Sequence, residues 1–231
     1  CIKDRPAMLG FFAAMLYNQN NVAAEASPVT TLLEMQVGKD LCKMLGYKVP
    51  SKEEADAGVI QPWGHITCDG SVANLESMWA SRNLKYYPIS LAEALKSESA
   101  LSSARNITIP LLNGEQAVLA ELDTWTLLNL KADDILAIPT RIDKEYGISP
   151  ETLTAALANY TLQGLGFEEF SRKLLRDGVQ TAVIMAPSTM HYSWPKAAAV
   201  LGIGANNVEK ILVDLDARME LQHRRSRLDV C

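Results

Sequence analysis

The sequence predicts an α/β fold in which parallel strands are connected by crossover helices. An apolar run at 181–186 is ended by Pro187 and is typical of a buried parallel strand. Small and apolar residues at 195–201 then recur with helical spacing, and a second strand is expected at 210–214. Because helices and strands alternate in this way, we expect the strands to form one sheet with helices packed on it.

The N-terminal part of the chain is predicted to be helical. Ser27 suits the N-cap of a helix and Pro28 suits its first position. Apolar residues at helical spacing follow up to Gly46 and form a stripe that we expect to face the core. This stripe consists of Val29, Leu33, Val37, Leu41 and Met44. The pattern Ser51-Lys-Glu-Glu54 has the form of a capping box and predicts a short helical turn.

Residues 8–16 form an apolar stretch that is too short to cross a bilayer. We expect this stretch to be a helix that is buried in the core or against a second chain, and we expect no membrane contact. The residues expected to be covered are Leu9, Phe11, Phe12 and Leu16.

The middle of the chain is predicted to contain several helices and one strand. A helical face begins near Val72, and a capping-box pattern at 90–93 predicts that a separate short helix covers 91–95. The other elements expected here are a loop over 97–105, a strand over 107–112, and helices over 119–138, 150–160 and 167–176.

The composition is that of an ordinary soluble protein, with 48% hydrophobic residues, 21% charged residues and a net charge of −5 over 231 residues. This charge argues against a nucleic-acid-binding surface, and the basic run at 223–227 is interpreted as a solvated helix face. The four cysteines lack the paired spacing of a zinc site, so we expect no bound metal. Reduced cysteines favour a cytoplasmic location.

Two loops carry residue types that suit a phosphate-bearing cofactor. Gly70-Ser71-Val72-Ala73 enters a predicted helix, and the free N–H groups and dipole of a helix N-terminus favour an anion. His191 follows a predicted strand and precedes a predicted helix. Taken alone, the first loop could be an ordinary turn into a helix, and the histidine could serve packing. A P-loop is a poor alternative because the required lysine is absent.

Three ordered blocks, at 27–46, 70–83 and 191–219, together resemble the group II pyridoxal-phosphate (PLP) decarboxylases. The segment at 91–178 is similar to the insertion of the microbial tyrosine decarboxylases. The resemblance implies part of the large cofactor domain of a PLP-transferase type I fold, with a mostly helical insertion. It also implies three parts: the first part of the PLP-binding domain at 1–90, the insertion at 91–178, and the continuation of that domain at 179–231.

The resemblance assigns roles to four residues around the cofactor. The Ser71 hydroxyl and the N–H groups of Val72 and Ala73 would hold the phosphate of PLP, and small residues there let the phosphate approach the backbone. His191 would stack on the pyridine ring and act as a catalytic residue by orienting the substrate. Imidazole suits this role because it has a flat face and a polar edge.

The resemblance also implies a homodimer. Asn20, Asn21 and Val22 align with a loop that, in dimers of the family, reaches toward the substrate pocket of the other subunit; an ordinary solvated loop is the alternative. Lys196 is interpreted as a surface residue. The Schiff-base lysine and the aspartate that protonates the pyridine nitrogen are expected beyond residue 231, so the chain is expected to be a fragment that is inactive alone.

The function implied by the resemblance is PLP-dependent decarboxylation of an L-amino acid, with tyrosine or another aromatic amino acid as the expected substrate. Glutamate is an alternative substrate. A non-catalytic PLP-fold scaffold or dimerisation partner is an alternative function, and a phosphate-binding module unrelated to PLP is a further one.

Overall fold

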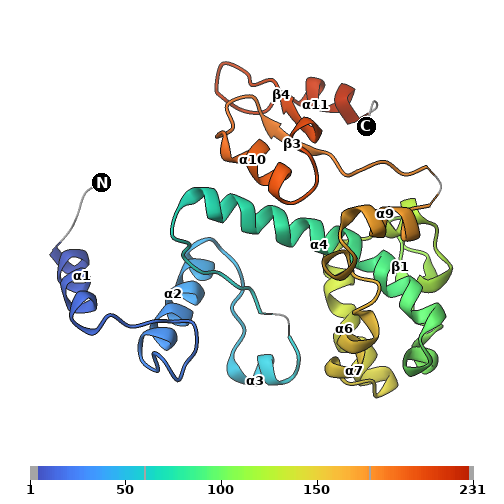
Figure 1. The fold of residues 1–231 in the computed structure, drawn as a ribbon, viewed down its shortest axis with the longest axis horizontal. Coiled ribbons are helices and arrows are strands. Elements are labelled where there is room, and N and C mark those ends of the chain that lie inside the picture. The colour runs from blue at the N-terminus through green and yellow to red at the C-terminus, as the bar shows by residue number, and fades with distance from the viewer. Residues whose placement is uncertain (1–4, 60, 177, 229–231) are drawn as a thin grey trace. The chain divides into compact units, whose positions relative to one another are not determined.

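The computed structural model describes residues 5–59, 61–176 and 178–228, and the chain divides into two compact units, Cys1–Cys68 and Asp69–Cys231 (Figure 1). The first unit contains the helices α1 (Arg5–Tyr17), α2 (Thr30–Met44) and α3 (Lys52–Asp56). The capping box predicted for α3 is confirmed. The Glu54 N–H donates to the Ser51 hydroxyl at 3.2 Å, and the Ser51 N–H donates to the Glu54 carboxylate at 2.8 Å.

The predicted core-facing stripe of α2 is wrong. The helix is present, but it begins at Thr30 and its buried residues are Gly38 and Cys42, whereas Val29 and Met44 are 68% and 73% exposed. The reason is the segment against which α2 packs. Gly38 packs against the backbone of Gly64, and a Cβ atom on Gly38 would overlap the Gly64 carbonyl oxygen. This contact therefore buries the small residues Gly38 and Cys42 of α2 and leaves its apolar stripe uncovered.

Helix α1 forms as predicted, but it is not buried in a core of this chain. None of its residues is buried, and the side chains expected to be covered are exposed. Their exposed fractions are 72% for Leu9, 65% for Phe11, 57% for Phe12 and 83% for Leu16. Burial of these side chains against a second chain therefore stays a prediction.

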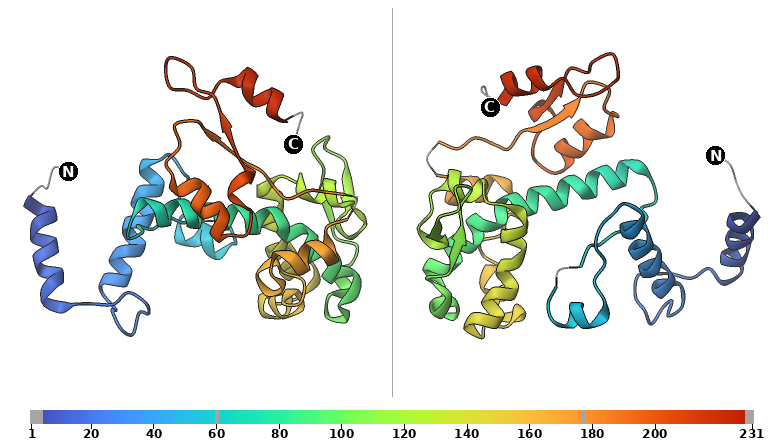
Figure 2. Two further views of the ribbon diagram at one scale, coloured as in Figure 1. Left: turned by 45° about the horizontal axis from the view of Figure 1, so that its top comes forward. Right: turned by 180° about the vertical axis from the view of Figure 1, so that it is seen from behind.

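The second unit is organised around one long helix, α4 (Gly70–Ser97), which the views of Figures 1 and 2 show running through it. The separate helix predicted at 91–95 is wrong, because α4 continues through Pro88 and Ser90. The Ser90 hydroxyl donates to the Tyr86 carbonyl at 3.4 Å instead of capping a new helix. Leu91 and Leu95 are fully buried in the core, and this burial outweighs the local capping signal.

A mostly helical layer packs on the second half of α4. Its elements are η1 (Ser99–Ala104), η2 (Leu119–Glu121), α5 (Thr124–Leu128), α6 (Ala132–Tyr146), α7 (Pro150–Leu157), α8 (Leu162–Leu165) and α9 (Phe167–Leu174). The strands β1 (Thr108–Pro110) and β2 (Gln116–Val118) pair antiparallel beside them. The strand predicted over 107–112 is present as β1, and the helix predicted to begin at residue 150 is present as α7, which Ser149 caps. The predicted helix over 119–138 is wrong in extent, since it is divided into η2, α5 and α6.

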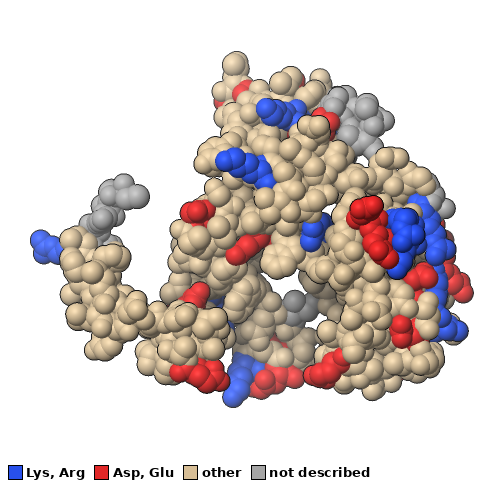
Figure 3. All heavy atoms as spheres, in the orientation of Figure 1, with Lys and Arg blue, Asp and Glu red and all other residues tan. Residues whose placement is uncertain are grey.

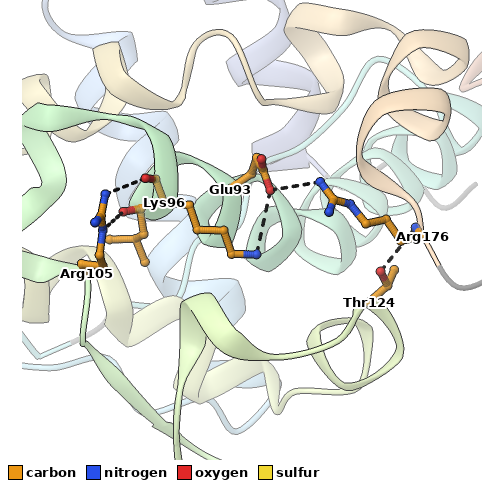
Figure 4. Close-up of polar contacts among 6 residues, drawn as sticks. Glu93, Lys96, Arg105, Thr124 and Arg176 are labelled. Carbon is orange, nitrogen blue, oxygen red and sulfur yellow. Dashed lines mark hydrogen bonds and ion pairs between the residues drawn. The ribbon is translucent and has the colours of Figure 1, made fainter.

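The side chain of Arg105 caps the C-terminal end of α4, as Figure 4 shows. The guanidinium of Arg105 donates to the carbonyl of Leu95 at 3.2 Å and to that of Lys96 at 2.6 Å. The last carbonyls of a helix lack intrahelical partners, so a positive donor there is favourable. Glu93 lies 3.7 Å from Arg176, which connects α4 to the segment after α9.

The predicted strand–helix–strand order is confirmed in the C-terminal part of this unit. Strands β3 (Ile184–Pro187) and β4 (Val208–Ile211) pair in parallel, with Ile184 opposite Val208, and α10 (Ser193–Val200) connects them before η3 (Ala205–Asn207). Ala186, Ala198, Ile203 and Val208 form a small core of their own. The last element that the structure describes is α11 (Leu221–Leu228). This arrangement of helices and small sheets is compatible with the α/β class, while the PLP-transferase type stays a prediction.

The predicted three-part division also stays a prediction, and its boundary at residue 90 falls within α4. Charge is mixed on the face drawn in Figure 3, where acidic and basic side chains lie next to one another. Ion pairs within helices include Arg141 with Glu145 at 2.8 Å and Lys173 with Glu169 at 2.5 Å.

Candidate functional site

Asp69 caps the N-terminus of α4, and the backbone at Gly70 stays accessible. The Asp69 carboxylate accepts the Val72 N–H at 2.9 Å, and the Asp69 carbonyl accepts the Ala73 N–H at 3.2 Å. The N–H groups of Gly70 and Ser71 precede the first intrahelical hydrogen bond and have no acceptor within the helix. A Cβ atom on Gly70 would meet nothing within 4 Å, so the backbone here is open to approach.

The predicted phosphate ligands are therefore only partly available in this structure. Ser71 is half-buried, and its hydroxyl has no hydrogen-bond partner among the described residues. The N–H groups of Val72 and Ala73 are both engaged by Asp69. An anion at this site would bind the Ser71 hydroxyl and the first two N–H groups, and it would compete with the Asp69 carboxylate for the Val72 N–H.

His191 lies in the loop between β3 and α10, and a chain of hydrogen bonds connects it to the first turn of α4. The Ser193 N–H donates to His191 Nδ1 at 3.2 Å, and the Ser193 hydroxyl lies 2.9 Å from the same nitrogen. The Asn74 side-chain amide donates to the Ser193 hydroxyl at 2.8 Å. The structure thus brings His191 to the helix that begins at Gly70 and Ser71.

The His191 ring is exposed and lies next to the ring of Tyr192. The ring centroids of His191 and Tyr192 are 4.1 Å apart with an interplanar angle of 41°. The Lys196 ammonium lies 4.7 Å from the centre of the Tyr192 ring, within the range of a cation–π contact. Lys196 is exposed, which confirms its interpretation as a surface residue.

A second contact joins α4 to the end of α10. Arg82 donates through Nη1 to the carbonyl of Leu201, the C-cap of α10, and burial lowers the pKa of the Arg82 guanidinium. One turn further along α4, the Tyr86 hydroxyl accepts the N–H of Ala182, and burial raises the pKa of Tyr86. These contacts place α4 along the strand–helix–strand element over several turns, so the position of His191 does not depend on one contact alone.

The third group of predicted site residues belongs to the first unit. The Asn21 side chain donates to the Glu34 carboxylate at 2.8 Å and accepts from the Thr30 hydroxyl, so it ties the loop to the first turns of α2. The Val22 N–H donates to the Asn20 side chain at 3.1 Å. All three loop residues are exposed. Their role in a substrate pocket stays a prediction.

Sequence reasoning did not find Asn74 and Ser193. Both are small polar residues near the start of a helix, which is a common position with no specific meaning. The one signal that could have identified Ser193 is its place two residues after His191, where a serine can reach the imidazole. Its burial, at 3% exposed, is visible only in the structure.

Two further properties of the described residues concern metal binding and membrane crossing. Within residues 5–59, 61–176 and 178–228, no group of three or more His, Cys, Asp and Glu side chains is placed to hold a metal ion. In the same parts of the chain, none of the helices combines the length and hydropathy that crossing a bilayer requires.

Comparison with known proteins shows that the sequence of this chain is similar to those of decarboxylases. The chain is 32% identical over 217 residues to an L-tyrosine decarboxylase from Levilactobacillus brevis, a match that covers 94% of this chain and 27% of that protein. It is 31% identical over 216 residues to an L-tyrosine decarboxylase from Enterococcus faecalis and 29% identical over 216 residues to one from Enterococcus faecium, with the same shares covered. The chain is similar to L-tyrosine decarboxylases.

The chain spans about a quarter of the length of these relatives, 27% in each case. Because the similarity covers 94% of the chain, it includes most of the helical layer at 91–178 as well as the segments that carry Ser71 and His191. The similarity supports a decarboxylase family. No protein-family model matches the chain.

Proposed function

We propose that this chain is part of a PLP-dependent decarboxylase that acts on tyrosine or another aromatic L-amino acid. The observation that supports the proposal is the connection from Asn74 through Ser193 to His191, which links an exposed imidazole to the helix that begins at Gly70. The same chain is similar to L-tyrosine decarboxylases over 94% of its length.

The residues at this site fit the two parts of the cofactor. The Ser71 hydroxyl and the N–H groups of Gly70 and Ser71 would hold the phosphate, and the dipole of the 28-residue helix α4 favours its negative charge. The exposed His191 ring would lie against the pyridine. The Asp69 carboxylate would oppose an anion, and it would release the Val72 N–H when phosphate binds.

When bound, PLP supplies an electron sink for the negative charge that remains at Cα after carbon dioxide leaves. The residues of this chain would contribute binding and orientation. Ser71 would anchor the cofactor by a charge-assisted hydrogen bond, which is stronger than a neutral one. His191 would limit motion of the ring and offer Nε2 to the substrate carboxylate. Both groups are positioned by α4, so the anchor and the stacking ring would keep one relative geometry.

The relatives' names support tyrosine as the substrate, while glutamate is the alternative within the same chemistry. The exposed apolar side chains of α1 support a homodimer, because an apolar surface of this kind is typical of a subunit contact. A cytoplasmic location is consistent with this function and stays part of the proposal.

The test measures release of labelled carbon dioxide by the intact protein that carries this chain, with PLP added. We expect release from carboxyl-labelled L-tyrosine above the background of free PLP, and much slower release from L-glutamate. Faster release from glutamate would reject the aromatic substrate. Absence of PLP binding and of release from either amino acid would reject the decarboxylase and leave a non-catalytic role.

A further inference from the structure

The hydrogen bonds at His191 define which ring nitrogen carries the proton. A backbone N–H can only donate, so the Ser193 N–H, at 3.2 Å from Nδ1, requires a lone pair on that nitrogen. A proton on Nδ1 would face this N–H directly. The neutral ring therefore carries its proton on Nε2, which has no hydrogen-bond partner among the described residues.

The Ser193 hydroxyl supports the same tautomer only because of Asn74. The Asn74 amide donates to the hydroxyl oxygen at 2.8 Å, which leaves the hydroxyl proton available for Nδ1 at 2.9 Å. With the Asn74 amide reversed, its oxygen would take the hydroxyl proton, and two lone pairs would face each other between Ser193 and Nδ1. The three side chains therefore satisfy one another in only one direction.

The position of these hydrogen bonds lets them anchor the His191 ring. Ser193 is 3% exposed, so water competes little for its hydrogen bonds, whereas the His191 ring lies at the surface. Asn74 is three residues after Ser71 on α4. The donor that would hold the phosphate and the donor that fixes His191 thus belong to the same helical turn.

We propose that Ser193 and Asn74 are positioning residues that hold His191 as the Nε2–H tautomer and keep that N–H available to a ligand at the start of α4. The identity of the ligand rests on the proposed function, but the tautomer does not. No role in covalent chemistry is assigned to either residue.

The test is nitrogen NMR of selectively labelled histidine in the intact protein, with the His191 signal assigned from its loss in His191→Asn. We expect the neutral wild-type ring to be almost entirely the Nε2–H tautomer. Ser193→Ala removes the hydroxyl. Asn74→Asp reverses the direction of the hydrogen bond between residues 74 and 193, because a carboxylate accepts the hydroxyl proton. Each should lower the ratio of Nε2–H to Nδ1–H about fivefold, as expected for the loss of one hydrogen bond of about 1 kcal/mol.

Ser81→Ala is the matched control, because Ser81 is an exposed serine of α4 whose hydroxyl donates to the Ser77 carbonyl at 2.8 Å, outside this network. Its ratio should equal that of the wild type. An unchanged ratio in both Ser193→Ala and Asn74→Asp would overturn the inference, as would a wild-type ring with substantial Nδ1–H.

A second measurement separates this inference from the proposed function. In the PLP-loaded protein, Ser193→Ala should lower kcat for L-tyrosine about tenfold and change the Kd for PLP less than threefold, since the ring is misoriented while the phosphate contacts remain. If the wild type binds no PLP, the proposed function fails and the NMR ratio still decides the positioning role. If the wild type is active and the ratio is unchanged in the variants, the positioning role alone fails.

Discussion

Asn74 and Ser193 are 119 residues apart in the sequence, and the Asn74 side-chain amide donates to the Ser193 hydroxyl at 2.8 Å. This bond joins the first turn of α4 to the first residue of α10. Through the Ser193 contact with Nδ1, it extends to His191. Two short motifs that are each uninformative alone thereby become parts of one site. The geometry around this site and the packing within each unit lead to four predictions.

Ser71→Ala should weaken binding of PLP to the intact protein about tenfold to a hundredfold. The hydroxyl is expected to donate to a phosphate oxygen, and a hydrogen bond to a charged group is worth about 1.5–3 kcal/mol. Fluorescence titration of the apoprotein measures the change. Ser81→Ala, in the same helix, is the control and should bind PLP like the wild type. Equal affinities for Ser71→Ala and the control would contradict the phosphate role.

Asp69→Asn should tighten the binding of PLP several-fold at low salt. Asparagine is as good an N-cap as aspartate, so the helix start is preserved, while the negative charge that competes with the phosphate is removed. The gain should shrink as ionic strength rises, because exposed charges are screened. A weaker affinity in Asp69→Asn would show that the carboxylate does not oppose the phosphate.

Gly38→Ala should destabilise the first unit by about 1–3 kcal/mol. The new methyl group would overlap the Gly64 carbonyl oxygen, and backbone on both sides leaves little room to adjust. Hydrogen exchange of the α2 amides measures the local effect. Gly10→Ala is a matched control in α1, where a Cβ atom meets nothing within 4 Å, and it should stabilise its helix by up to about 1 kcal/mol. Similar effects of the two substitutions would argue against the Gly38 contact.

The stability of the second unit should fall between about pH 10 and pH 12. Burial raises the pKa of Tyr87 to about 12, above the value near 10 expected in the unfolded chain. The unfolded chain therefore loses this proton first, so the stabilisation is complete below pH 10 and is lost as pH rises through the folded value.

Urea unfolding at a series of pH values measures this loss, which should be at most about 3 kcal/mol for Tyr87. Tyr87→Phe should flatten the alkaline slope, although burial also raises the pKa of Tyr86 and part of the slope should remain. Tyr17→Phe replaces an exposed tyrosine of α1 and serves as the control. A slope in Tyr87→Phe equal to that of the wild type would contradict the assignment.

Elements with local signals were predictable from the sequence. The capping box of Ser51 and Glu54, the cap of α7 by Ser149 and the order β3–α10–β4 depend on residues that are neighbours in the chain. Where packing competed with a local signal, the prediction was wrong. Ser90 has the pattern of a cap, but it lies within α4 because the residues around it are buried.

Part of the candidate site was likewise predictable from the sequence, and part of it was not. The sequence by itself determined which residue types are present for a cofactor: a small loop with Ser71 before a helix, and His191 after a strand. Only the tertiary structure decided that Asn74 and Ser193 join them, and that Gly38 rather than the apolar stripe of α2 is buried. The physical reason is that capping and periodicity act within a few residues, whereas these contacts join segments whose proximity depends on how the whole unit packs.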